Sequence, residues 1–169
     1  MEKDLLISKI KTLNELLPIR SELKKSGRRV VFSNGVFDIL HRGHVEYLTR
    51  ARQLGDVLII GLNSDASVRR IKGPARPIVP QEDRAVVLAG LAAVDYICFF
   101  EEDTPQKLIA ALLPDVLVKG ADYRTEEIVG FKEVTENGGT VQTIELTPGR
   151  STTDVVGKVI ELFKKGILK

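Results

Sequence analysis

The chain has 169 residues, 43% hydrophobic and 28% charged, a balance typical of a folded globular protein and not of a disordered chain. The net charge is only +2, from lysines and arginines spread along the sequence, which argues against nucleic acid as the main partner. The longest apolar runs, such as 57–62, are too short to cross a bilayer, and the charged amino-terminal stretch lacks a signal-peptide core, so we expect a cytoplasmic protein without a membrane partner.

Helical and extended patterns alternate along the chain. Residues 5–25 form an amphipathic helical lead-in that we expect to be broken near Pro18, because proline interrupts a helix interior. Short apolar runs then predict strands, and amphipathic stretches predict helices between them. The expected strands are 30–33, 57–63, 96–100, 115–120 and 141–146, and the expected helices are 43–54, 65–71, 81–92, 104–113, 125–137 and 152–164.

This alternation predicts the fold class α/β, with a Rossmann-like, doubly wound, five-stranded parallel sheet. The first four strands are almost continuously apolar, as strands buried on both faces should be. In such sheets, ligands bind beyond the carboxyl ends of the strands, at the point where the strand order reverses. We see no repeat or linker in the sequence, so we predict a single domain over residues 1–169.

The two histidines, His41 and His44, are the only ones in the chain. They follow the first predicted strand, which ends at 34–35, and lie around Gly43, where a helix begins. Residues three apart share a helical face, and a helix amino terminus attracts anions. The pair therefore suits a polyphosphate whose charge grows during a reaction.

Either histidine alone could be a cap or a surface group. A zinc site lacks a third histidine or an available cysteine, so we predict no protein-held metal.

A loop rich in proline and glycine, residues 69–84, leaves the same side of the predicted sheet. It carries Lys72, Arg76 and Arg84, and lysine and arginine side chains bind phosphate as a point charge or as a bidentate clamp. The alternative is an ordinary solvated loop.

Two more segments place polar side chains at this end of the sheet. Lys119 and Asp122 follow the fourth strand, although Asp122 could simply be a turn residue beside a glycine. Ser151 precedes the last helix and resembles the start of a capping box with Asp154, so capping alone could explain it.

The segment GVFDILHRGHVEYL, residues 35–48, resembles the signature of the HxGH nucleotidyltransferase superfamily. The resemblance implies that His41, His44 and Lys72 act on the triphosphate and its transition state, and that Asp38 faces the acceptor substrate. It also implies a set of residues that bind the nucleotide and its phosphates: Gly35, Val36, Phe37, Arg84, Lys119, Asp122, Ser151, Thr152 and Thr153. The roles of Arg76 and Arg150 stay open.

Longer matches over about residues 28–160 resemble adenylyltransferases that use D-glycero-β-D-manno-heptose 1-phosphate. This implies a transferase that joins ATP and a sugar 1-phosphate into ADP-heptose, a lipopolysaccharide precursor, with Mg²⁺ accompanying ATP and a homodimer possible. Since the chain carries no kinase half, we expect the stand-alone form.

Two alternatives stay open: a glycerol-3-phosphate-type cytidylyltransferase, and a module that binds ATP without turning it over. Some cytidylyltransferases carry an arginine five residues before the serine of the last segment, where this chain has Leu146 and instead places Arg150 beside the serine. A dinucleotide-dependent redox enzyme is disfavoured because the first strand–helix turn has no GxGxxG pattern.

Overall fold

The computed structural model describes residues 2–121 and 124–168. Within these residues no helix is long and apolar enough to span a membrane. The helices are α1 (Glu2–Ile7), α2 (Leu13–Lys25), α3 (Arg42–Arg52), α4 (Asp65–Lys72), α5 (Gln81–Ala89), α6 (Gln106–Leu112), the 3₁₀ helix η1 (Thr125–Glu127), α7 (Phe131–Glu136) and α8 (Thr152–Lys164). The strands are β1 (Val30–Gly35), β2 (Val57–Asn63), β3 (Tyr96–Phe100), β4 (Val116–Gly120) and β5 (Thr140–Ile144).

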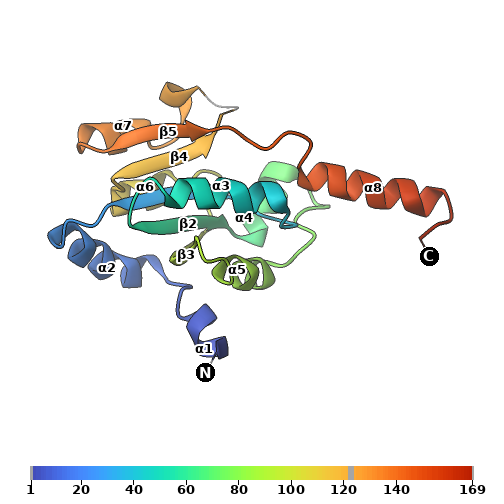
Figure 1. Ribbon diagram of the computed structural model, residues 1–169, viewed down its shortest axis with the longest axis horizontal. Coiled ribbons are helices and arrows are strands. Elements are labelled where there is room, and N and C mark those ends of the chain that lie inside the picture. Colours follow the sequence, from blue (N-terminus) through green and yellow to red (C-terminus); the bar gives the residue numbers. More distant parts are fainter. Residues whose placement is uncertain (1, 122–123, 169) are drawn as a thin grey trace.

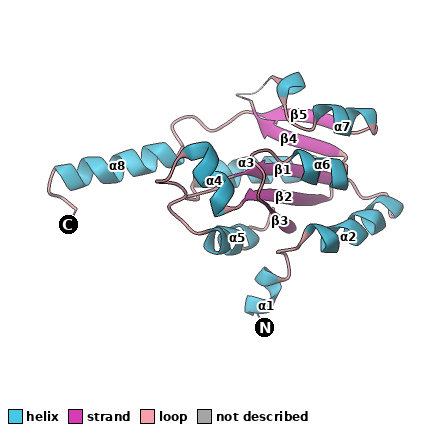
Figure 2. Cartoon of the chain, turned by 180° about the vertical axis from the view of Figure 1, so that it is seen from behind, coloured by secondary structure: helices cyan, strands magenta, loops and turns pink. Residues whose placement is uncertain are grey.

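The five strands form one parallel sheet in the order β3-β2-β1-β4-β5, which confirms the predicted doubly wound fold. The chain builds from β1 outward to β3 and then returns to place β4 on the other side of β1. The order therefore reverses between β1 and β4, in the middle of the sheet; Figure 2 labels all five strands, and Figure 1 shows the same sheet from the other side. This is the position at which a ligand cleft is expected.

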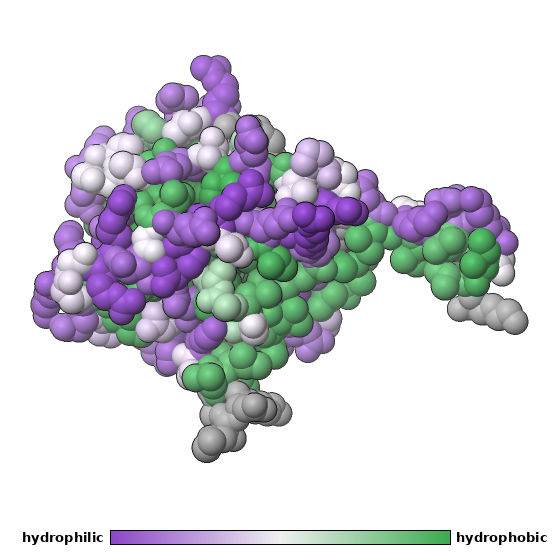
Figure 3. Space-filling view, viewed as in Figure 1, coloured by the Kyte–Doolittle hydropathy of each residue, from purple (hydrophilic) through white to green (hydrophobic). Residues whose placement is uncertain are grey.

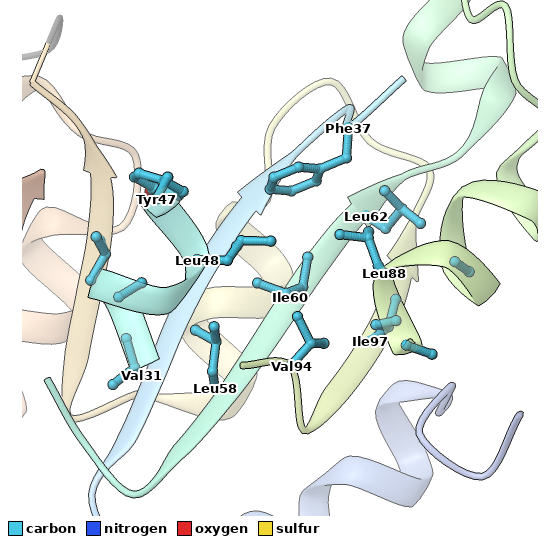
Figure 4. Packing of buried hydrophobic residues seen from close by; sticks show 14 of the residues in the cluster. Val31, Phe37, Tyr47, Leu48, Leu58, Ile60, Leu62, Leu88, Val94 and Ile97 are labelled. Atoms are coloured by element: carbon cyan, nitrogen blue, oxygen red, sulfur yellow. The ribbon is translucent and has the colours of Figure 1, made fainter. Parts of the chain in front are cut away.

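Alternating side chains of the central strands divide the core between the two faces of the sheet. Leu58, Ile60 and Leu62 of β2 face α3 and α5, where they pack with Leu48 and Leu88 (Figure 4). The intervening side chains face the other layer, which is formed by α2, α6 and α7 and is seen from behind in Figure 2. Because successive residues of a strand point to opposite faces, a continuously apolar strand fills both layers.

The helical lead-in is broken at a different place from the one predicted. The break lies at residues 8–12, and Pro18 sits inside the continuous helix α2. Thr12 starts α2 with a capping box: its hydroxyl accepts the N–H of Glu15 at 3.3 Å, and its own N–H reaches the Glu15 carboxylate at 2.8 Å. This cap and the burial of Leu16 against the sheet hold the helix together despite the proline.

The stretch 125–137, predicted as one helix, is divided into η1 and α7. Gly130 lies between them with a positive φ of 93°, a conformation that glycine adopts without strain. A Cβ atom at this position would lie 2.7 Å from a methyl carbon of Ile109, so the glycine also lets the chain approach α6 closely. The other predicted elements differ only by a few residues at their ends.

Replacing Pro18 by alanine should stabilise the protein. The proline side chain is exposed, so little packing is lost, and alanine restores an N–H donor to the carbonyl of Asn14. We expect the free energy of unfolding to rise by roughly 1 to 2 kcal/mol, because the gain in helix propensity exceeds the entropy gained by the unfolded chain. Urea denaturation measures this change. Ser21→Ala, at another exposed position of α2, is the matched control and should change stability by less than about 0.5 kcal/mol. A destabilised Pro18→Ala variant would contradict the expectation.

Candidate active site

A cleft of about 870 Å³ lies over the carboxyl ends of β1, β2 and β4, at the point where the strand order reverses. It is the place that the predicted fold assigns to a ligand. Most of the predicted site residues line it: Gly35, Val36, Phe37, Asp38, His41, His44, Lys72, Lys119, Ser151, Thr152 and Thr153. Arg76 and Arg150, whose roles the sequence left open, line it as well. Segments more than a hundred residues apart in the chain are thus brought to one cleft.

The two histidines stand side by side at the start of α3. His41 is the residue before the helix, and its side chain makes no capping hydrogen bond, so the capping interpretation does not hold for it. Its ring stacks on that of His44, with centroids 3.9 Å apart and an interplanar angle of 22°. The ring of Phe37 meets His44 edge-on at 5.2 Å. The stacked rings therefore form an aromatic wall of the cleft.

Gly43, between the histidines, allows the last segment of the chain to meet this wall. A Cβ atom at this position would lie 3.1 Å from the His41 ring and 3.1 Å from Cβ of Arg150. These distances are tighter than ordinary van der Waals contact. A larger residue at position 43 would push apart the histidine pair and the segment that leads into α8.

Both histidines are held neutral in the free protein. Burial, followed by the nearby His41 ring, lowers the pKa of His44 from 6.5 to about 4. Burial also lowers the pKa of His41, and Arg150 acts in the same direction, against the attraction of Asp154. The Nδ1 atoms of both rings are buried and have no hydrogen-bond partner among the described residues. Because an imidazolium needs acceptors at both nitrogens, this environment favours the uncharged rings until an anion enters.

The start of α8 supplies backbone donors to the adjoining wall of the cleft. The Ser151 hydroxyl accepts the N–H of Asp154 at 3.0 Å and donates to its carboxylate at 2.7 Å, which confirms the predicted cap. The Thr152 hydroxyl contacts the carbonyl of Ile39 at 3.4 Å, which ties the helix start to the loop before the histidines. First-turn N–H groups of a helix lack intrahelical acceptors, so this wall attracts anions.

A polar contact that sequence reasoning missed holds the segment before α8 against α3. The Glu46 carboxylate accepts a hydrogen bond from the hydroxyl of Thr147 at 2.5 Å and from Nε of Arg42 at 2.6 Å. Glu46 lies two residues after His44 in the same helix. Nothing in the local sequence pairs residues 46 and 147, because only the fold brings them together.

Asp38 accepts hydrogen bonds from the loop between α4 and α5, which forms another edge of the cleft. Its carboxylate accepts hydrogen bonds from Arg76 at 2.7 Å and from the N–H groups of Ile78 and Val79 at 2.8 and 2.9 Å. Burial alone would raise the pKa of Asp38, but these three donors outweigh it and keep the pKa below its ordinary value. The contacts give Asp38 and Arg76 a structural task, and the contact of Asp38 with an acceptor substrate stays a prediction.

Arg84 does not lie among the residues that line the cleft, although a phosphate contact was expected of it. It is 1% exposed, and its guanidinium donates to the carbonyls of Val36, Asn63 and Val79 and to the carboxylate of Asp65 at 2.8 Å. These hydrogen bonds join α5 to the carboxyl ends of β1 and β2. Arg84 itself is buried in the first turn of α5, so an arginine in the expected place in the sequence does not line the cleft.

The remaining predicted cations lie at the rim. Lys72 is the last residue of α4 and is exposed beside the cleft. Lys119 lies in β4 and donates to the carbonyl of Asn34 at 3.2 Å. Asp122 lies outside the described residues, so its predicted contact with the nucleotide is not placed.

Other residues that line the cleft were not singled out from the sequence. Tyr47 forms part of the wall, and its hydroxyl lies 2.8 Å from that of the buried Ser33. Asn63 is the last residue of β2, and the segment 103–105 follows β3 at the same edge. The rule that ligands bind at the carboxyl ends of strands, applied to the second and third strands as well, would have found Asn63 and 103–105 but not Tyr47, which lies in α3.

Comparison with known proteins agrees with this arrangement. Residues 32–158 match the sequence profile of the cytidylyltransferase-like family. The chain is 48% identical over 94% of its length to the bifunctional protein HldE of Syntrophotalea carbinolica, 53% identical over 92% to that of Trichlorobacter lovleyi, and 55% identical over 93% to that of Escherichia coli O1:K1. It spans about a third of the length of these relatives.

Solved structures give the same fold. The crystal structure of a lipopolysaccharide core biosynthesis protein from Thermoplasma volcanium superimposes with a TM-score of 0.59 at 29% identity, covering 72% of this chain and 98% of that one. A pantoate-beta-alanine ligase from Francisella tularensis superimposes with a TM-score of 0.56 at 15% identity, covering 92% of this chain and 78% of that one, and shares the fold alone.

Titration of the two histidines should report on the cleft directly. In the free protein, the imidazole proton resonances of His44 should titrate near pH 4 and those of His41 below 6.5. Inorganic pyrophosphate should raise both pKa values, because a nearby anion favours the charged ring. NMR resolves the two signals, and His41→Gln assigns them. An ordinary pKa for His44, or pKa values unmoved by saturating pyrophosphate, would show that the rings do not form an anion site.

Proposed function

Because the chain belongs to the cytidylyltransferase-like family, we propose that it transfers the AMP unit of ATP to D-glycero-β-D-manno-heptose 1-phosphate and releases pyrophosphate. The product of this reaction is ADP-heptose. The cleft supports the transfer of a nucleotide, and resemblance supports the acceptor.

One observation carries the nucleotidyl transfer. The stacked His41 and His44 and the amino terminus of α8 line the same cleft, at the reversal point of a parallel sheet. Two neutral imidazoles can donate hydrogen bonds, and backbone N–H groups add further donors. A cleft with these walls is suited to a triphosphate, which carries several negative charges on oxygen atoms.

Support for the acceptor comes from resemblance. The long segments of the sequence resemble adenylyltransferases for heptose 1-phosphate. The relatives named bifunctional protein HldE align with 92 to 94% of this chain. The structural match named as a lipopolysaccharide core biosynthesis protein agrees with a product of this kind.

The chemistry requires an in-line displacement at the α-phosphorus of ATP. A phosphate oxygen of the sugar phosphate forms a new bond to that phosphorus, and the bond to the β-phosphate oxygen breaks, so that pyrophosphate leaves with the bonding electrons. The attacking oxygen is already anionic at neutral pH, so neither a general base nor a covalent enzyme intermediate is needed. The main obstacle is the repulsion between two anions, and positioning with positive groups reduces it.

The residues of this chain divide that task. His41 and His44 hydrogen-bond the triphosphate, and the approach of phosphate raises their pKa, so that they offer more positive charge as negative charge develops on the leaving group. The first turn of α8, residues 151–153, holds the terminal phosphates. Lys72, exposed at the end of α4, reaches the phosphates from the rim.

Mg²⁺ fits this proposal as a companion of ATP. The described residues contain no group of three or more histidine, cysteine, aspartate or glutamate side chains that could hold a metal ion. The Asp38 carboxylate at the cleft is already bonded to Arg76 and two backbone N–H groups. The phosphate oxygens of ATP and water would therefore supply most ligands of Mg²⁺, and the ion would neutralise part of the phosphate charge.

Pyrophosphate release tests the whole proposal. The purified chain should release pyrophosphate with ATP and the β anomer of heptose 1-phosphate, and much less with CTP or with the α anomer. Reaction with CTP and glycerol 3-phosphate instead would replace the proposal by a cytidylyltransferase. ATP binding with no release across a panel of sugar phosphates would replace it by a nucleotide-binding module.

Removing either histidine should slow the reaction strongly. We expect His41→Asn and His44→Asn each to lower kcat by a factor of about 10² or more, as the loss of one transition-state donor does. Circular dichroism and thermal unfolding check that the variants fold. Val45→Ala, at an exposed position of the same helix, is the matched control and should keep near-native turnover. A folded double-histidine variant with native turnover would exclude the proposed role of the pair.

A further inference from the structure

The segment between β5 and α8, residues 145–151, forms part of the cleft, although the helix that follows it is not packed on the body of the protein. Leu146, Thr147 and the stretch 150–153 line the cleft. Figure 1 shows α8 extending away from the sheet, and Figure 3 shows its apolar side uncovered. None of the residues of α8 is buried. The first turn of α8 is therefore held at the cleft by its own contacts and by those of the segment before it.

Thr147 is the residue through which this segment contacts α3. Among residues 145–150 it is the one that is not exposed. Its hydroxyl donates to the Glu46 carboxylate at 2.5 Å. The next polar contact along the chain, from the Thr152 hydroxyl to the carbonyl of Ile39, is longer, at 3.4 Å, and joins two neutral groups. Because a hydrogen bond to an ionised group is roughly twice as strong as one between neutral groups, the bond to Glu46 is the stronger of the two.

Glu46 is fixed in the body of the protein and is ionised. It lies in α3, which packs on the sheet through the buried Leu48. The hydrogen bonds from Thr147 and from Arg42 hold the pKa of Glu46 below its ordinary value, so the carboxylate is charged at neutral pH. Glu46 is not among the described residues that line the cleft. Its contact with a bound ligand is therefore indirect, through the segment that it holds.

Only a short stretch of chain separates this contact from the donors at the start of α8. Residues 148–150 lie between Thr147 and Ser151. Pro148 has a fixed φ, and Cβ of Arg150 is packed beside position 43. A shift of Thr147 is therefore passed on to Ser151 and to the backbone N–H groups of the first helical turn.

We propose that Glu46 is a positioning residue: through Thr147, its carboxylate holds the start of α8 in the place where it binds the terminal phosphates of a nucleotide. The inference rests on the proposed function, because the cleft must take a polyphosphate. Without the contact, the start of α8 occupies its binding position for only part of the time. The apparent affinity for phosphate then falls in proportion to that fraction.

Electrostatics alone predicts the opposite effect for the loss of Glu46. The residue carries a negative charge beside a site for anions, so its removal should strengthen anion binding if Glu46 has no positioning role. A positioning role predicts weaker binding, because the donors at the start of α8 are no longer held in place. The sign of the change in affinity therefore distinguishes the two.

Calorimetric titration of the full chain with inorganic pyrophosphate tests the proposal. Glu46→Ala and Thr147→Val should each raise the Kd for pyrophosphate about tenfold, which corresponds to about 1.4 kcal/mol. The double variant should lose no more than either single variant, because both changes remove the same contact. Thr147→Ser keeps the hydroxyl and should recover most of the affinity. The matched control is Thr49→Val, which removes an exposed hydroxyl that bonds only within α3, to the carbonyl of Val45, and should leave the Kd unchanged.

Steady-state kinetics separates positioning from catalysis. In Glu46→Ala and Thr147→Val, the KM for ATP should rise about tenfold while kcat changes less than about threefold. The reason is that the contact supports phosphate binding equally in the ground state and in the transition state. Loss of a histidine, in contrast, should lower kcat. Circular dichroism and thermal unfolding check that the variants fold.

The outcomes distinguish this inference from the proposed function. A folded Glu46→Ala variant that binds pyrophosphate as tightly as the wild type, or more tightly, would overturn the positioning role and leave the proposed function intact. Losses that add in the double variant would also overturn it, because Glu46 and Thr147 would then act separately. A wild-type chain that does not bind pyrophosphate would overturn the proposed function, and this inference with it.

Discussion

The absence of a side chain at position 43 is the constraint on which the cleft depends. Position 43 is packed against the His41 ring on one side and Arg150 on the other, both at 3.1 Å from where a Cβ would stand. Through this contact the first turn of α3 meets the segment that leads into α8. The hydrogen bond from Thr147 to Glu46 fixes the same approach one helical turn away. The two walls of the site, a hundred residues apart in sequence, thus share one close contact.

Lys72, Arg76, Lys119 and Arg150 line the cleft, whereas Arg84 is buried and does not line it. Arg84 holds strand ends together from the rear, and Arg76 is committed to Asp38. The histidine pair, by contrast, is uncharged because burial lowers the pKa of both rings, and each ring can still gain a proton. An anion close to the rings would raise their pKa values, so the charge of this wall would respond to what the cleft holds.

Much of this arrangement could be predicted from the sequence, and the exceptions have physical causes. Apolar strands and amphipathic helices gave the sheet and its order of elements, and the histidine spacing located the cleft. The prediction that Pro18 breaks the helix was wrong because helix propensity describes only the local chain. The cap at Thr12 and the burial of Leu16 outweigh the cost of the proline. The sequence position of Arg84 suggested a ligand contact, but whether a side chain faces the ligand or the core depends on how α5 sits on the sheet. The Glu46–Thr147 contact arises only from tertiary structure.

The phenol ring of Tyr47 places a fluorescent side chain in the wall of the cleft. Its hydroxyl is anchored to Ser33, and its ring forms part of the cleft wall. The chain contains three tyrosines and no tryptophan, so tyrosine dominates its ultraviolet emission and no indole masks it. A molecule that contacts Tyr47 in the cleft should change the emission of one of the three tyrosines. Such a change would report binding in the unlabelled protein, without coupled enzymes or a reporter dye.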